Sequence, residues 1–272
     1  MSLVCLCSAH GSPGVTTTAL ALAGAWPQGR RCLLVEADPF GGVMAARFGL
    51  RDAPGLASLA AVTRKGLDAG VVWHHAQQLA GGVRVLVGPP SADQAHAVLR
   101  DLASALAEWS AGETEVDVIA DCGRLAPGSP TLVALQQADT VLVLTRPTPD
   151  QLRPAGHRVA TLGVSGTRPK LLLVGDSPYG AAEVAAALPV EVAGVVAWDP
   201  RAAEALSGGV GDPNLRRSPL VRAAASLAHR LAAELPSQMA SLARRLAAEL
   251  PARMADAADA RPGPTGVEMG RL

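Results

Sequence analysis

The chain carries a glycine-rich stretch near its start, His10-Gly11-Ser12-Pro13-Gly14-Val15-Thr16-Thr17. This stretch follows a short apolar run, Leu3 to Leu6, and leads into an Ala- and Leu-rich segment from Thr16 to Ala25. A strand, a glycine loop and a helix in this order are typical of a phosphate-binding loop. Backbone N–H groups in such a loop, with the helix N-terminus behind them, form a concave anion site. The sequence therefore predicts a phosphate-binding loop.

The loop contains no lysine. Loops that transfer phosphate place an ammonium group beside the β- and γ-phosphates, where it offsets charge that builds up in the transition state. Val15 stands at that position, and neither of the chain's lysines, Lys65 and Lys170, is near the loop in sequence. We therefore expect the loop to bind phosphate and to transfer it weakly or not at all.

Length and composition limit the classes of protein. A chain of 272 residues suits one large α/β domain or one domain with an appendage. Its hydrophobic content of 49% with only 3% aromatic residues predicts a well-filled core of Ala, Val and Leu. The formal net charge is zero, so there is no general electrostatic attraction to nucleic acid or to an acidic membrane.

The cysteines and the apolar runs indicate the compartment. Cys5, Cys7, Cys32 and Cys122 lie in apolar runs and lack the CxxC spacing of a zinc site. We expect buried, reduced thiols and a cytoplasmic protein. The N-terminus has no basic leader typical of a signal peptide, and no apolar run approaches the ~20 residues that span a bilayer.

Apolar runs alternate with helical patterns over most of the chain. Strands are predicted at Leu3–Ser8, Cys32–Glu36, Val83–Val87, Val116–Asp121, Thr140–Thr145, Lys170–Val174 and Val190–Val196. Helices are predicted at Thr16–Ala25, Ala92–Trp109, Thr131–Gln137, Pro149–Leu162, Ala181–Leu188 and Arg201–Leu206, and Gly55–Gln78 reads as helical with loops. Strands that are apolar on both faces predict an α/β fold, with a mainly parallel sheet flanked by helices on both faces. Ligands of such sheets bind beyond the carboxyl ends of the strands.

The C-terminal region contains a near-duplicate with a 15-residue period, LAHRLAAELPSQMAS at 227–241 and LARRLAAELPARMAD at 242–256. Its leucines and methionines recur every three or four residues, as in an amphipathic helix, which Pro236 and Pro251 should kink or divide. We predict a P-loop domain at 1–225, an appended helical tail at 226–256 and a disordered end at 257–272. Three roles stay open for the tail: packing on the domain or a second subunit, contact with a membrane surface, or binding of a partner.

Two acidic strand ends accompany the loop. Asp38 follows the apolar run Leu33–Glu36, and Asp121 ends the run that begins at Val116. An aspartate at the carboxyl end of a strand can hold Mg²⁺ directly or through water. Thr16, next to the lysine position, is the natural hydroxyl ligand for the same ion. Helix capping or a turn is the alternative role for Asp38 and Asp121.

These segments resemble the ParA/MinD family of deviant Walker ATPases over about residues 1–225. The family pattern KGGxGK[ST]T lies over His10–Thr17, its DxDPQG segment over Glu36–Gly41, and its DxxPG-type strand end over Asp121–Gly123. More narrowly, LLVEADPFGG, DCGRL and WDPRAA resemble actinobacterial relatives that accompany tight-adherence (Flp) pilus and secretion ATPases, as TadZ does. The resemblance implies bound ATP and Mg²⁺, a homodimer formed through the loop face, and a role for Asp38 in orienting the attacking water.

The chain departs from the family at functional positions. The signature lysine falls on His10, the loop lysine on Val15, a loop glycine on Ser12, and an asparagine near the base on Gly175. The Walker A loop is therefore degenerate and lacks both lysines. An arginine from elsewhere is an alternative source of charge, and the candidates are Arg47, Arg124 and Arg146.

We therefore expect a nucleotide-binding protein with weak or absent ATP hydrolysis that acts as a dimeric positioning or scaffold factor, for a Tad/Flp-type pilus or secretion system. The expected nucleotide-binding residues are Gly11, Ser12, Pro13, Gly14, Val15, Thr16 and Thr17, and the expected magnesium-binding residues are Thr16, Asp38 and Asp121. Two alternatives remain: an active ATPase of chromosome or plasmid partitioning, and an interaction module that binds no nucleotide. The neutral charge gives no strong sign of nucleic-acid binding.

Overall fold

The computed structural model describes residues 2–63, 67–112, 116–164, 169–208 and 214–234. Its centre is an eight-stranded sheet with the order β3-β4-β2-β5-β1-β6-β7-β8. The strands are β1 Leu3–Ser8, β2 Arg31–Glu36, β3 Gln77–Gln78, β4 Arg84–Leu86, β5 Val116–Arg124, β6 Thr140–Thr145, β7 Pro169–Val174 and β8 Val192–Val196. All neighbouring strands pair in parallel except β3 and β4, which are antiparallel.

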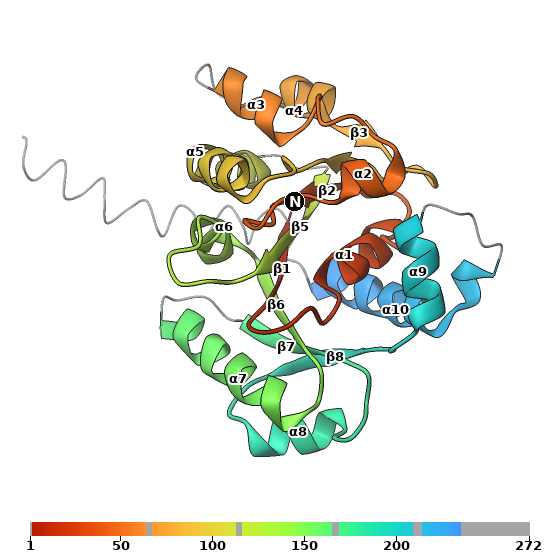
Figure 1. Cartoon of the computed structure of the whole chain (residues 1–272). Helices are drawn as coiled ribbons and strands as arrows, with labels where there is room; N and C mark the ends of the chain where they lie inside the picture. Colours follow the sequence, from red (N-terminus) through yellow and green to blue (C-terminus); the bar gives the residue numbers. More distant parts are fainter. Residues whose placement is uncertain (1, 64–66, 113–115, 165–168, 209–213, 235–272) are drawn as a thin grey trace, which may run out of the picture. The chain divides into compact units, whose positions relative to one another are not determined.

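Helices cover both faces of the sheet (Figure 1). They are α1 Val15–Gly24, α2 Met44–Phe48, α3 Leu56–Val62, α4 Ala69–His75, α5 Ala92–Gly112, α6 Leu132–Gln137, α7 Pro149–Val164, α8 Ala181–Ala187, α9 Pro200–Gly208 and α10 Pro219–Glu234. Helices α1, α2, α9 and α10 pack against one face, and α3 to α8 pack against the other. The predicted fold class is confirmed.

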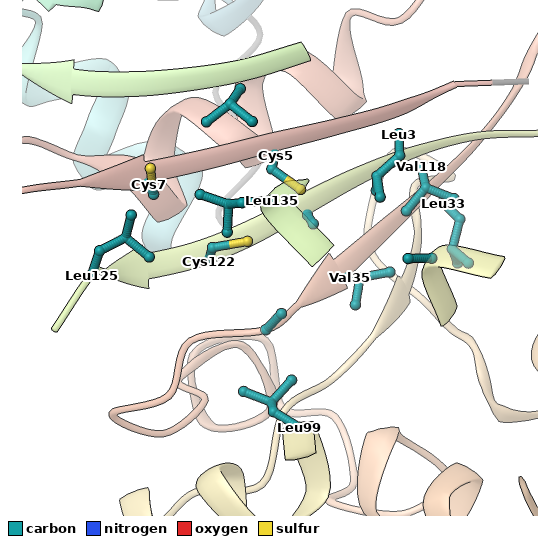
Figure 2. Close-up of a cluster of buried hydrophobic side chains, with 14 of the residues drawn as sticks. Leu3, Cys5, Cys7, Leu33, Val35, Leu99, Val118, Cys122, Leu125 and Leu135 are labelled. Carbon is teal, nitrogen blue, oxygen red and sulfur yellow. The ribbon is translucent and has the colours of Figure 1, made fainter. Parts of the chain in front are cut away.

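Alternate residues of the central strands enter two separate cores, as the pleat of a strand requires. In β1, Val4 and Leu6 belong to the core under α1, while Cys5 and Cys7 belong to the core on the opposite face. Figure 2 shows this second core, where Cys5, Cys7 and Cys122 lie among leucine and valine side chains. The four cysteines are free, and burial raises the pKa of the Cys7 and Cys32 thiols. The thiols of Cys5, Cys7 and Cys122 therefore pack as small apolar groups in this core.

The expected strands and helices are present, with ends that differ by a few residues from those predicted. The segment Gly55–Gln78, which was expected to be helical with loops, forms α3, α4 and the short antiparallel strand β3. The boundary predicted between residues 225 and 226 falls inside α10, whose Leu227 and Leu231 are buried against the sheet. The remainder of the predicted tail, from residue 235, and the predicted disordered end lie outside the described residues. Among the described helices, none combines the length and hydropathy needed to cross a bilayer.

The topology brings the candidate residues together. Strand β1 lies between β5 and β6, so the loop that follows Ser8 emerges at the centre of the carboxyl edge. Leu6 of β1 and Glu36 of β2 both pair with Asp121 of β5. The loop, the acidic end of β2 and the acidic end of β5 therefore meet at one edge of the sheet.

Candidate functional site

The glycine-rich loop ends directly at the N-terminus of α1. Gly14 is the N-cap residue, with φ 99° and ψ 40°, and Gly11 has φ 64°. Both conformations are left-handed, which glycine adopts without the steric cost that a Cβ brings. No side chain caps α1 and its first turn has no acidic residue. The N–H groups of that turn, which lack acceptors within a helix, are therefore available to an anion.

The side chain at the lysine position points into the protein. Val15 is 7% exposed and packs in the core under α1 with residues such as Val4 and Leu6. Position 15 therefore contributes a backbone N–H to the loop and no charge. His10, at the other lysine position, is exposed and lies near enough to Asp150 to lower the pKa of that carboxyl, after the larger effect of the Thr148 side chain.

A cavity of about 570 Å³ opens over the loop. The described residues that line it are Ser8, Gly11, Ser12, Gly14, Val15, Thr16, Thr17, Asp38, Phe40, Val43, Arg47, Gly123 and Arg124. Six of the seven loop residues predicted to bind nucleotide are therefore at this cavity, and Pro13 lines a smaller one of about 190 Å³ beside it. Asp38 faces the cavity directly, whereas Asp121 lies buried behind it.

Asp121 is a fully buried carboxylate with one oxygen left over. Its Oδ1 accepts a hydrogen bond from Gly123 N–H at 3.1 Å. Its Oδ2 is also buried, and no donor among the described residues forms a hydrogen bond with it. Burial raises the pKa of Asp121 to about 7, against the lowering effect of the Thr16 hydroxyl and the Gly123 N–H. A buried carboxylate oxygen without a donor is costly, and a cation would remove that cost.

Asp38 occupies a tight position above Gly123. Its Oδ1 accepts a hydrogen bond from Phe40 N–H at 2.8 Å, which forms an Asx-type turn. One oxygen of Asp38 therefore stabilises a turn, which was the alternative role predicted for this residue. A Cβ built on Gly123 would overlap the Asp38 carboxyl group, and Gly123 has φ 57°. Burial raises the pKa of Asp38, while the Phe40 N–H and the charge of Arg124 lower it.

Glu36, the other member of the acidic pair, has a structural role. Its Oε1 accepts hydrogen bonds from Val43 N–H at 2.6 Å and Met44 N–H at 2.8 Å, and its Oε2 accepts one from Gly88 N–H at 2.9 Å. The side chain is 2% exposed, and burial raises its pKa against those three donors. Glu36 therefore fixes the segment that carries Asp38, and its oxygens are already occupied.

The residues present fit a magnesium ion. The unpartnered Asp121 oxygen, the Thr16 hydroxyl and the half-buried Asp38 carboxylate are the hard oxygen donors that Mg²⁺ prefers. Within the described residues no group of three or more His, Cys, Asp or Glu side chains could hold a metal by itself. Phosphate oxygens and water would have to complete the coordination of an ion held here.

A second cavity, of about 610 Å³, lies at the carboxyl ends of β6, β7 and β8. Gly175 and Asp176 after β7 line it, together with Trp198 after β8 and Arg146 after β6. The Arg146 guanidinium stacks 3.9 Å from the centre of the Trp198 ring. The smaller cavity at Pro13 shares lining residues with both larger ones, so the three lie in a row along the carboxyl edge.

No protein-family model matches the chain, and no curated protein matches its sequence. Solved structures match it over most of its length. The ParA family ATPase of Chlorobium tepidum has a TM-score of 0.67 at 16% identity, covering 85% of this chain and 99% of that chain. MinD of Pyrococcus horikoshii, solved with Mg-ADP, has a TM-score of 0.67 at 19% identity, covering 85% and 95%. The chain has the fold of the ParA and MinD ATPases.

A third structure, a variant of McdA from Cyanothece in complex with ATP, has the same fold, with a TM-score of 0.60 at 16% identity over 85% of this chain and 96% of that one. Identities this low establish the ParA/MinD-like fold alone, so the residues of this chain must carry the functional argument. Phe40 lies in the Glu36–Gly41 segment and Arg124 in the DCGRL segment, but neither segment indicates that the two side chains are in contact.

Proposed function

We propose that the chain is a ParA/MinD-like nucleotide-binding protein whose ATP hydrolysis is weak or absent. The observation that supports this proposal is that the N-terminus of α1 has no side-chain cap and adjoins a cavity of about 570 Å³, while the Val15 side chain is buried. Backbone N–H groups at a helix N-terminus bind phosphate without a lysine, since each donates a hydrogen bond within a favourable dipole. Transfer of phosphate needs a positive group that stabilises the negative charge of the transition state, and position 15 supplies none.

Thr16, Asp38 and Asp121 would hold Mg²⁺ in this proposal. When bound, Mg²⁺ neutralises phosphate charge and orients the terminal phosphates. Asp121 supplies the otherwise unpartnered oxygen, and Asp38, held by the Phe40 N–H, orients a water molecule in front of the phosphate if hydrolysis occurs. The base would occupy the second cavity, where Gly175 and Trp198 lie.

We further propose that the chain forms a homodimer through the face that carries the loop. Large apolar side chains are exposed around the cavities of this face: Phe40 is 44% exposed, Val43 39% and Trp198 55%. Exposed apolar groups gathered around a site favour a protein partner. The resemblance of the DCGRL and WDPRAA segments to pilus-associated relatives supports a positioning or scaffold role in a Tad/Flp-type pilus or secretion system, with its ATPase as partner.

The direct test is calorimetry with Mg-ATP and Mg-ADP on the wild type and on two variants of the exposed Ser12. Ser12→Glu places a negative charge in the loop, and Ser12→Gln is the matched neutral control. We expect the wild type and Ser12→Gln to bind Mg-ATP and Ser12→Glu to lose at least about tenfold in affinity.

Two outcomes would overturn the proposal. A wild type that shows neither heat nor thermal stabilisation with Mg-ATP would be an interaction module that binds no nucleotide. A turnover number of about 1 s⁻¹ or more, within the ordinary range for enzymes, would identify an active ATPase. In that case a salt-sensitive DNA complex that depends on ATP would favour the partitioning function.

A further inference from the structure

We infer that Arg124, together with Arg47, binds the terminal phosphate of a nucleoside triphosphate in place of the missing lysines, so that the site selects triphosphates over diphosphates. This inference rests on the proposed nucleotide binding and adds the residues and the selectivity. It depends on where the two arginines lie in the sheet order, on what holds Arg124, and on the charge of the cavity.

The strand order shows on which side of the loop each cavity lies. Arg124 ends β5, and Arg47 is in the last turn of α2, which follows β2, so both come from the β5–β2 side of the loop. The second cavity lies at β6, β7 and β8, on the other side of β1. A nucleotide with its base in that cavity and its phosphates on the loop would direct its last phosphate towards β5 and β2. The two arginines line the cavity at that end.

Contacts with its neighbours hold the Arg124 side chain at the cavity. Its guanidinium carbon lies 4.8 Å from the centre of the Phe40 ring, a cation–π contact. Phe40, Asp38 and Arg124 all line the same cavity. The guanidinium is therefore placed beside the position expected for the third phosphate before any ligand binds, which reduces the entropy lost on binding.

The charge of the cavity favours a cation from the protein in addition to Mg²⁺. Asp38 faces the cavity, and Asp121 and Glu36 lie behind it, so carboxylates surround the expected phosphate position. Among the described lining residues the cationic side chains are Arg47 and Arg124. A guanidinium donates two parallel hydrogen bonds to phosphate oxygens, a geometry that an ammonium cannot match. Arg146, the third candidate, stacks on Trp198 at the other end of the row and cannot serve here.

The test compares the affinity of a non-hydrolysable Mg-ATP analogue with that of Mg-ADP in Arg124→Gln, Arg47→Gln and the double variant. Arg100→Gln, at an exposed arginine of α5 that does not line the cavity, is the matched control. We expect Arg124→Gln to weaken the analogue about ten- to hundredfold and Mg-ADP less than about threefold. Arg47→Gln should have a smaller effect in the same direction. Both arginines are exposed, so these variants should fold normally.

Phe40→Leu provides a second readout, since it removes the ring and keeps an apolar side chain. We expect it to reduce the preference for the triphosphate analogue, because Arg124 no longer has a ring on which to stack. Equal loss of both nucleotides in Arg124→Gln, or no loss of either, would overturn the inference and leave nucleotide binding itself intact. If the wild type binds neither nucleotide, the proposed function and this inference both fail.

Discussion

The carboxylate of Asp38 lies directly against Gly123, so closely that a Cβ at position 123 would overlap it. Gly123 follows Asp121 and Cys122 at the end of β5 and donates its N–H to Asp121. One glycine therefore allows the acidic ends of β2 and β5 to approach each other closely.

Gly123→Ala should abolish Mg-ATP binding and lower stability, because the new methyl group displaces Asp38 and the residue has φ 57°. We expect a loss of roughly 2–4 kcal/mol in the free energy of unfolding, from steric overlap and the left-handed backbone. Gly128→Ala is the matched control: it has φ 72° but open space at its Cβ, so it should lose only about 1–2 kcal/mol and keep nucleotide binding. Urea denaturation and calorimetry measure both quantities, and normal Mg-ATP binding by Gly123→Ala would contradict the arrangement.

Val15→Lys tests the missing ammonium group. The substitution removes a buried valine from the core under α1, so we expect the free protein to lose roughly 1–2 kcal/mol of stability. Lysine can extend its charged end towards the loop, so Mg-ATP should stabilise this variant more than the wild type. Val15→Met has similar length without charge and serves as the control. Equal ATP-induced shifts of the melting temperature in both variants would show that charge at position 15 is not what limits binding.

Asp121→Asn tests the buried carboxylate through pH. The pKa of Asp121 is about 7 in the folded state against an ordinary value of 3.8, so between these values the folded state binds more protons than the unfolded state. The free energy of unfolding contributed by this group therefore falls as pH rises from about 4 to 7, by on the order of 3 kcal/mol. Asn resembles the protonated form, so the variant should be more stable than the wild type at pH 8 and nearly equal to it at pH 4.5. A difference that does not change with pH would refute the assignment.

Glu36→Gln and Asp38→Asn separate the two members of the acidic pair. Glu36 accepts three backbone N–H groups, and an amide at one of those positions leaves a buried donor facing a donor. We expect Glu36→Gln to lose about 1–3 kcal/mol of stability. Asp38→Asn should lose less than about 1 kcal/mol but remove the Mg²⁺ dependence of nucleotide binding. The opposite pattern in denaturation and calorimetry would assign the metal to Glu36.

Much of the fold could be predicted because its signals are local. The strands β1, β2, β5, β6 and β7 are apolar on both faces and helices separate them, so their order along the chain already indicated a parallel sheet. Strand β3 was missed, since Gln77 and Gln78 form a two-residue antiparallel pair with β4 and have no apolar pattern. The helices α2, α3 and α4 are too short to give a clear period.

The candidate site was predictable only where the motifs are contiguous. The loop, Asp38 and Asp121 were expected together, and the topology places them at one edge. The structural role of Glu36 was not expected, because it depends on N–H groups at Val43, Met44 and Gly88 that only the fold brings near. The stacking of Arg124 on Phe40 depends in the same way on two segments that the sequence separates by more than eighty residues.

The central claim is that backbone N–H groups of the loop hold phosphate without either lysine. A crystal structure of the chain with Mg²⁺ and a non-hydrolysable ATP analogue tests it most directly. We predict phosphate oxygens at about 2.7–3.2 Å from the backbone nitrogens of Gly14 to Thr17, with the Val15 side chain still buried. A loop cavity that stays empty at saturating analogue, or phosphates held by side chains with no backbone contact, would contradict the claim.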